Sequence, residues 1–110
     1  MLPNADRAHV DLRKLRDYSL SSAHDVGQHK ARVFRAALGL GAADAEWLRD
    51  RILEGVRSAQ AVETGIFPYG VLYRVDIPVE TETGAATVRT GWIVRSHESF
   101  PRLTTCYVVS

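Results

Sequence analysis

Residues 87–95 read Thr-Val-Arg-Thr-Gly-Trp-Ile-Val-Arg, and Val, Thr, Trp and Val recur in them at every second position. Because successive strand residues point to opposite faces of a sheet, this period of two predicts a β-strand. Residues 71–77 alternate in the same way, with Val, Tyr, Val and Ile at the odd positions. The second face of the first stretch carries Arg89, Gly91 and Arg95, so it is free to be a working surface.

The sequence Thr-Glu-Thr-Gly at 81–84 lies between these two strands and favours a hairpin. We expect a last strand over about 102–109 and a short further strand over about 61–66. Strict alternation divides the last strand into two sets, Leu103, Thr105 and Tyr107 on one side and Arg102, Thr104 and Cys106 on the other. Both sets contain polar residues, so the pattern leaves open which threonine faces outward.

Before about residue 59 the apolar residues recur at helical spacing instead. We expect a short helix over about 11–20 with an aspartate as its N-cap, and a second helix over about 26–38 that stops at Gly39. A third helix is expected to begin at Asp44 as its N-cap. Its residues at helical spacing are Trp47, Leu48, Ile52 and Val56.

The second expected helix has an unusual apolar face. Its apolar and small residues on that face are Gly27, Ala31, Phe34, Ala37 and Leu38. Lys30 falls inside the same arc, where a charge is costly unless it reaches solvent, pairs or binds something. Two histidines, His24 and His29, lie within six residues of it, although His29 projects away from this face and is expected at the surface. The cluster predicts catalysis or anion binding.

Helices followed by an antiparallel meander indicate an α+β fold, with two or three N-terminal helices packed on a three- to four-stranded antiparallel sheet. The length of 110 residues predicts a single domain over 1–110, and hydrophobic and charged contents of 45% and 25% are ordinary for a globular protein. Cys106 is the one cysteine, and neither a membrane-length apolar run nor a secretory start is present. We therefore expect a complete cytoplasmic protein in a reducing compartment, without membrane association.

Basic residues concentrate toward the two ends of the chain. Residues 7–35 carry seven Lys/Arg against three Asp/Glu, residues 36–82 carry four against eight, and residues 83–110 carry three against one. If the ends meet in space, they form a positive surface on a protein of net charge +1. The four histidines show no ligand spacing, and no phosphate-binding or dinucleotide motif is present, so we expect no metal and no cofactor.

A set of short motifs spans nearly the whole chain. They are Leu-Pro-Asn-Ala-Asp at 2–6, Lys-Leu-Arg-Asp-Tyr at 14–18, His24, Gly27, His-Lys-Ala at 29–31, Phe34, Gly39, Pro-Tyr-Gly at 68–70, Val-Arg-Thr at 88–90, Trp-Ile-Val at 92–94 and Pro-Arg-Leu-Thr-Thr at 101–105. With them the chain resembles a bacterial family of unknown function that occurs free-standing and as C-terminal domains of polymorphic toxins. The layout is similar to the ribonuclease toxin superfamily that groups barnase, EndoU, the tRNA-cutting colicins and RelE.

This resemblance implies metal-independent RNA cleavage on the sheet by attack of the 2′-hydroxyl, as an endoribonuclease toxin. It implies catalytic roles for His24, Lys30, Thr105 and Tyr107 and RNA binding by Arg35, Arg89 and Arg102. In this chemistry a histidine serves as acid or base, and cations and hydroxyl groups stabilise the phosphorane. An exposed aromatic among Tyr69, Tyr73 and Trp92 would stack a base, although Trp92 is expected in the core.

Three functions stay open on sequence grounds. The first is such a toxin, which cuts an RNA substrate and is held by a cognate antitoxin or immunity protein. The second is a non-catalytic interaction module or antitoxin-like partner, which would expose an apolar patch. The third is nucleic-acid binding without cleavage. The first predicts that His24 or Lys30 lies within about 10 Å of Thr105 or Tyr107, a spacing that one phosphate can bridge.

Overall fold

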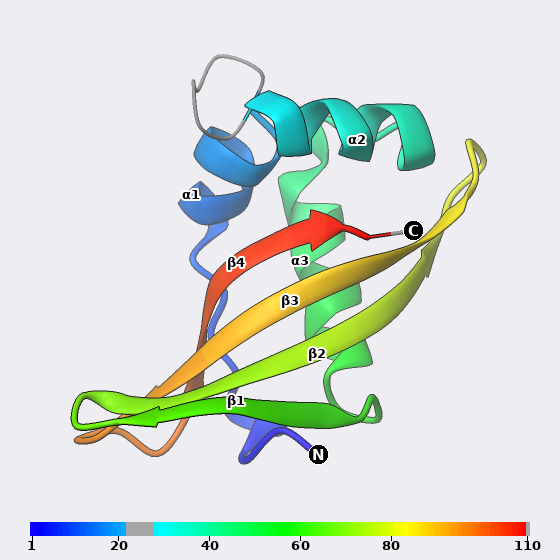
Figure 1. The fold of residues 1–110 in the computed structure, drawn as a ribbon. Helices are drawn as coiled ribbons and strands as arrows, with labels where there is room; N and C mark the ends of the chain where they lie inside the picture. Colours follow the sequence, from blue (N-terminus) through cyan, green and yellow to red (C-terminus); the bar gives the residue numbers. More distant parts are fainter. Residues whose placement is uncertain (22–27, 110) are drawn as a thin grey trace.

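The sheet is a four-stranded antiparallel meander in which each strand pairs with the next along the chain (Figure 1). A computed structural model describes residues 1–21 and 28–109. The strands are β1 (Ala61–Phe67), β2 (Gly70–Glu80), β3 (Ala85–Arg95) and β4 (Pro101–Val108). The predicted hairpin at 81–84 is confirmed, because the Thr81 N–H donates to the Gly84 carbonyl at 2.8 Å.

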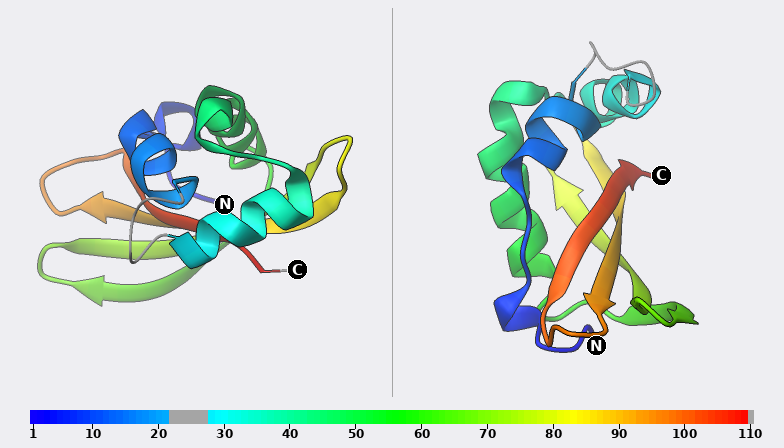
Figure 2. Two further views of the ribbon diagram at one scale, coloured as in Figure 1. Left: turned by 90° about the horizontal axis from the view of Figure 1, so that it is seen from above. Right: turned by 90° about the vertical axis from the view of Figure 1, so that its left-hand side faces the viewer.

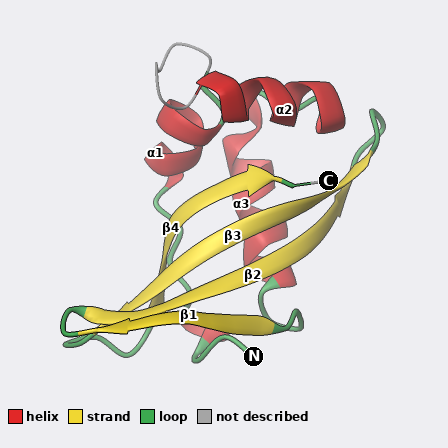
Figure 3. Cartoon of the chain, in the orientation of Figure 1, coloured by secondary structure: helices red, strands yellow, loops and turns green. Residues whose placement is uncertain are grey.

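Three α-helices precede the sheet within the described residues (Figure 3). They are α1 (Leu12–Lys14), α2 (Gln28–Leu38) and α3 (Ala45–Gly55), and three tighter or wider helical turns accompany them, η1 (Ala5–Arg7), η2 (Leu15–Ser19) and η3 (Ala42–Asp44). None of the helices in this part of the chain is long and apolar enough to cross a membrane. The α+β prediction is confirmed.

The helices lie on one side of the sheet (Figure 2). The α3 helix runs behind the strands in the view of Figure 1, and α2 crosses the end of β4. The opposite side, which we call the open face, has no covering element among the described residues. It is therefore the surface on which strand side chains meet solvent.

The core fills the space between the helices and the inner face of the sheet. The α2 helix contributes Phe34 and Leu38, as its spacing predicted. Trp92 is 1% exposed, and its indole N–H donates to Thr90 Oγ1 at 2.7 Å, while that hydroxyl donates to the Val75 carbonyl at 2.7 Å. Trp92 is thus a core residue, as expected, and a stacking role for it is wrong.

One detail of the prediction for the third helix is wrong. Trp47 is 40% exposed, because it sits one residue before the buried Leu48 and is rotated about 100° from it on the helix. The Arg51 guanidinium lies over its ring, 5.8 Å from the ring centre. Asp44 is the N-cap residue of α3, as predicted, but its side chain makes no capping hydrogen bond to that helix and instead accepts from the Gly41 N–H at 2.9 Å, at the start of η3.

The first helix follows its prediction more closely, since Asp11 caps it by accepting from the Arg13 N–H at 3.0 Å. Its expected continuation toward residue 20 is the π-helical turn η2. The end of the second helix at Gly39 is also confirmed, and this glycine has a φ of 69°. The expected start of that helix at 26 and the residues Gly27 and His24 lie outside the described residues.

The two edges of the sheet differ. Along β4 the backbone of His9 adds a parallel bridge, in which its N–H donates to the Pro101 carbonyl at 2.8 Å and its carbonyl accepts from the Leu103 N–H at 2.9 Å. The η2 turn and α2 also contact β4. At the other edge, β1 pairs with β2 and faces no further strand among the described residues.

Candidate functional site

A β-bulge decides which side chains of β4 reach the open face. Gly91 of β3 pairs with Thr105, but the next residue, Trp92, pairs with Leu103, so Thr104 is an extra residue in β4. The bulge interrupts the alternation. Leu103 and Cys106 are therefore both buried. Arg102, Thr105 and Tyr107 share the open face through their pairing with Ile93, Gly91 and Arg89. The two sets expected from strict alternation are wrong for this reason.

Lys30 reaches this part of β4 from the first turn of α2. Its Nζ donates a long hydrogen bond of 3.4 Å to Thr105 Oγ1 and lies 4.9 Å from the centre of the Tyr107 ring. The α2 helix crosses the end of β4 (Figure 1), and the Lys30 ammonium reaches the side of that strand on which Thr105 and Tyr107 lie. The prediction that Lys30 comes close to Thr105 and Tyr107 is confirmed, whereas the same prediction for His24 falls outside the described residues.

Arg89 continues the site on the neighbouring strand. It lies opposite Asp76 of β2 and donates two hydrogen bonds to that carboxylate, at 2.9 and 3.1 Å. These hydrogen bonds lower the pKa of Asp76 and raise the pKa of Arg89, and burial partly opposes both changes. On its other side Arg89 pairs with Tyr107, whose hydroxyl also favours the charged guanidinium.

These contacts connect five residues across three strands and one helix. We call Asp76, Arg89, Tyr107, Thr105 and Lys30 the polar row. It holds two cations against one carboxylate, with two hydroxyl groups between them. Lysine and arginine N–H groups and the two hydroxyls are all donors for phosphate oxygens, so the row is suited to binding a phosphate.

Gly91 leaves room beside the row. A Cβ at this position would lie 3.0 Å from Thr104 Oγ1 and 3.1 Å from Thr105 Cγ2, closer than side chains ordinarily pack. Glycine thus lets the bulged strand approach β3 and keeps the open face bare next to Thr105.

The other two predicted RNA-binding arginines lie outside the polar row, Arg102 further along the open face and Arg35 on α2. Arg102 donates two hydrogen bonds to Glu98, at 2.9 and 2.8 Å, which raise the pKa of Arg102 and lower the pKa of Glu98. Its guanidinium also lies 4.8 Å from the centre of the Phe100 ring. Arg35 sits in the last turn of α2, against Gly41, at the other end of the helix from Lys30. Neither belongs to the polar row.

Asp76 is the member of the row that sequence reasoning missed. The signal for it was present in the predicted hairpin. A tight turn over 81–84 fixes the antiparallel register, and counting back from it pairs position 76 with position 89. The oppositely charged pair follows directly from that register.

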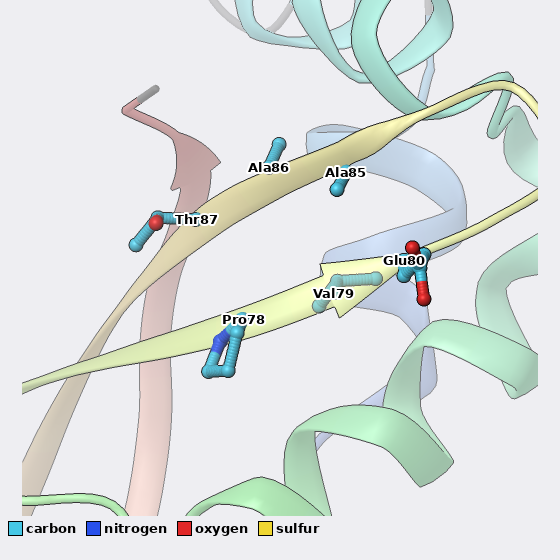
Figure 4. Close-up of a pocket in the computed structure, with 6 residues that line it drawn as sticks. All are labelled: Pro78, Val79, Glu80, Ala85, Ala86 and Thr87. Atoms are coloured by element: carbon cyan, nitrogen blue, oxygen red, sulfur yellow. The ribbon is translucent and has the colours of Figure 1, made fainter.

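A pocket lies between the polar row and the turn of the β2–β3 hairpin (Figure 4). It has a volume of about 470 Å³ and is lined by Pro78, Val79, Glu80, Ala85, Ala86 and Thr87. Glu80 is its one ionisable side chain, so the pocket offers little chemistry. Within residues 1–21 and 28–109 no group of three His, Cys, Asp or Glu side chains is arranged to hold a metal ion.

The fold and the site together define an α+β domain whose uncovered sheet face carries a row of basic and hydroxyl groups. The model of a domain of unknown function, DUF6883, matches residues 1–110, and the chain belongs to that family. A comparison with curated proteins finds no match.

Proposed function

We propose that this protein cleaves RNA at the polar row by attack of a 2′-hydroxyl on the adjacent phosphate. The observation that carries the proposal is the convergence of Lys30, Thr105 and Tyr107, with Arg89 beside Tyr107, on the open face of the sheet. Two cations and two hydroxyl donors face the same small area. A phosphate diester placed there would meet donors from α2, β3 and β4.

The reaction forms a bond between the 2′-oxygen and phosphorus and breaks the bond between phosphorus and the 5′-oxygen. It leaves a 2′,3′-cyclic phosphate and a free 5′-hydroxyl, so no water or co-reactant is consumed. One group must take the proton of the 2′-hydroxyl, and another must give a proton to the leaving oxygen. Negative charge builds on the non-bridging oxygens, which is where fixed cations lower the barrier most.

The residues of the row divide these tasks by their chemistry. Lys30 and Arg89 stabilise the charge on the non-bridging oxygens. Thr105 donates a hydrogen bond to one of them and holds the Lys30 ammonium in position. Tyr107, between the two cations, donates its proton toward the phosphate or the leaving oxygen. The acid–base role of His24 remains a sequence prediction, because that residue lies outside the described part of the chain.

The layout of the chain also supports the proposal. Helices that precede a four-stranded antiparallel sheet are the arrangement of the ribonuclease toxin superfamily that the sequence resembles. In that superfamily cleavage takes place on the sheet with basic, His and Thr or Tyr residues. A toxin of this kind acts on RNA in the cytoplasm and is restrained by a cognate antitoxin or immunity protein, and we extend both expectations to this chain.

The experiment compares two lysine variants, because Lys14 and Lys30 are the two lysines of the chain. Purified wild-type protein is expected to degrade total RNA and leave 2′,3′-cyclic phosphate ends. Lys30→Ala should lower the rate by about 100-fold, as the loss of one charge-stabilising donor does. Lys14→Ala, on the exposed surface of α1, should cut RNA at the wild-type rate. RNA that stays intact with the wild type rejects the proposal.

A non-catalytic interaction module is the alternative function. The observation in its favour is a set of exposed apolar side chains on and after β1, namely Val62, Ile66, Phe67 and Tyr69, which are 43%, 70%, 43% and 57% exposed. Such a surface is typical of protein contacts. Expression without any partner separates the two functions, because a ribonuclease arrests growth and degrades RNA whereas an interaction module does neither.

A further inference from the structure

Two exposed aromatic rings are stacked on each other where β1 turns into β2. The ring centres of Phe67 and Tyr69 are 5.1 Å apart, and the ring planes differ by 8°. Both residues are exposed, Phe67 at 43% and Tyr69 at 57%. A surface turn without a binding role seldom exposes two stacked aromatic rings to solvent.

The backbone holds this turn in one place. The Ser96 N–H donates to the Tyr69 carbonyl at 3.0 Å and so ties the β1–β2 turn to the β3–β4 loop. Gly70 has a φ of 157°, and a Cβ there would lie 2.6 Å from the Val94 carbonyl oxygen. The Tyr69 ring is therefore presented by a braced turn, which lowers the entropy cost of binding a flat ligand on it.

A shallow pocket adjoins the Tyr69 ring. It is lined by Tyr69, Ile93, Arg95, Ser96 and His97 and has a volume of about 290 Å³. Arg95 is 47% exposed, and its contact with Glu98 is long, at 4.0 Å. Glu98 is engaged instead by Arg102 at 2.8 Å, so the Arg95 guanidinium keeps donors for another anion. The pocket thus combines an aromatic face with a cation at its edge.

The pocket lies on the same face of the sheet as the polar row. Arg89, Gly91, Ile93 and Arg95 are alternate residues of β3, and they line the open face from the row to the pocket. Gly91 to Arg95 spans about 13 Å at the usual strand rise of about 3.3 Å per residue. The path between them is bordered by Arg74, which pairs with Gly91. The path therefore has cations at both ends and Ile93 between them.

We propose that Tyr69, backed by Phe67 and flanked by Arg95, is a base-stacking subsite for single-stranded RNA that lies along the open face of β3. This inference rests on the proposed function, because it places the strand that the polar row would cut. Stacking on Tyr69 holds a base a short way along the strand from the scissile phosphate. Arg74 and Arg95 contact the phosphates between them.

Charge favours RNA over a protein as the occupant of this surface. The open-face cations on or beside the path are Lys30, Arg74, Arg89, Arg95 and Arg102, and the carboxylates paired with them are Asp76 and Glu98. The excess is positive, which suits a polyanion. Exposed aromatic rings beside such cations are the common means of binding single-stranded nucleic acid without sequence preference.

The test measures binding without cleavage. The probe is a short single-stranded RNA with a fluorescent label and 2′-O-methyl groups throughout, which lacks the attacking hydroxyl. Fluorescence anisotropy should show that Tyr69→Ala weakens binding by about 5- to 150-fold, the usual effect of losing one stacked base. Tyr69→Trp should bind as the wild type does. Trp47→Ala is the matched control, since Trp47 is also an exposed aromatic beside an arginine but lies on α3.

The results separate this inference from the proposed function. A wild-type protein that does not bind the probe, or a Tyr69→Ala variant that binds it normally, overturns the subsite even if natural RNA is cut. Loss of binding in Tyr69→Ala with rescue in Tyr69→Trp supports the subsite even if no RNA is cut. An equal loss in Trp47→Ala would show that the effect is not specific to this face, and the subsite would be rejected.

Discussion

Asp76 and Arg89 lie directly opposite each other on β2 and β3 and share two hydrogen bonds on the open face of the sheet. The same arginine pairs with Tyr107 on its other side. A carboxylate therefore holds in place a guanidinium that we assign to phosphate binding.

Arg89→Ala should weaken RNA binding and reduce its dependence on salt. Losing one phosphate contact lowers the slope of log K against log salt by about 1. The measurement is anisotropy with the uncleavable RNA over a series of salt concentrations. Arg51→Ala on α3 removes an exposed arginine from the far side of the molecule and should leave the slope as it is. An unchanged slope in Arg89→Ala would exclude a phosphate contact at this position.

RNA cleavage should persist in EDTA. The reason is that Lys30 and Arg89 supply the positive charge that the phosphorane needs, and the 2′-hydroxyl supplies the nucleophile. A gel assay of total RNA with and without the chelator measures this. If added Mg²⁺ restores a rate that EDTA has abolished, the assigned roles of the two cations are wrong.

The cleavage rate should follow a titration in the neutral range. An imidazole with its ordinary pKa of about 6.5 serves as acid or base there, and the sequence assigns that role to His24. His24→Ala should lower the rate and flatten the pH profile between about pH 5 and 8. His29→Ala, five positions further on, is the control. If His24→Ala leaves the pH profile of the rate unchanged, a group other than His24 serves as the acid or base.

Thr90→Val should destabilise the fold by about 1–3 kcal/mol, which is the cost of leaving buried polar groups unpaired. The Thr90 hydroxyl joins the Trp92 indole to the Val75 carbonyl, and a valine can serve neither. Urea unfolding followed by Trp fluorescence gives the free energy of unfolding. Thr87→Val, at a half-exposed position of the same strand, should change it far less. If the two variants lowered the free energy of unfolding equally, the burial of Thr90 would not explain the effect.

Acid should lower the thermal stability through three carboxylates that accept hydrogen bonds from arginines. The pKa values of Asp11, Asp76 and Glu98 are lowered by these bonds, for Asp11 from 3.8 to about 2. Their stabilising contribution is complete above the unfolded values and is lost as pH falls through the folded ones. We expect Tm to drop progressively below about pH 4. Asp11→Asn should make the decrease of Tm at acidic pH smaller, whereas Glu46→Gln should leave that decrease unchanged.

The fold was largely predictable, because its main signals are local. The period of two in 87–95 and the turn at 81–84 depend on neighbouring residues, and both were confirmed. The prediction that Trp47 belongs to the apolar face of α3 was wrong, because helical spacing alone does not show where that face ends. The wide turn η2 also departs from a regular helix without a sequence signal that we recognise.

The site was predictable in part. The position of Lys30 on an apolar helix face was an anomaly that pointed to a partner, and Thr105 and Tyr107 are its partners. The side of β4 that faces outward was not predictable, because one extra residue at Thr104 reverses the alternation and depends on the close approach that Gly91 permits. The pairing of Arg102 with Glu98 was missed because a loop, not a strand register, brings the two together.

The backbone of His9 against β4 affects how the protein can associate with itself. Sheets of separate molecules can join edge to edge into filaments when each copy offers two unpaired edge strands. Here one edge carries the bridge from His9 and is bordered by η2 and α2, whereas β1 pairs with no further strand among the described residues. Pairing of β1 with β1 of a second copy consumes the available edge of both molecules and closes the assembly at two. By covering the β4 edge, the N-terminal segment thereby limits strand-by-strand association to two copies.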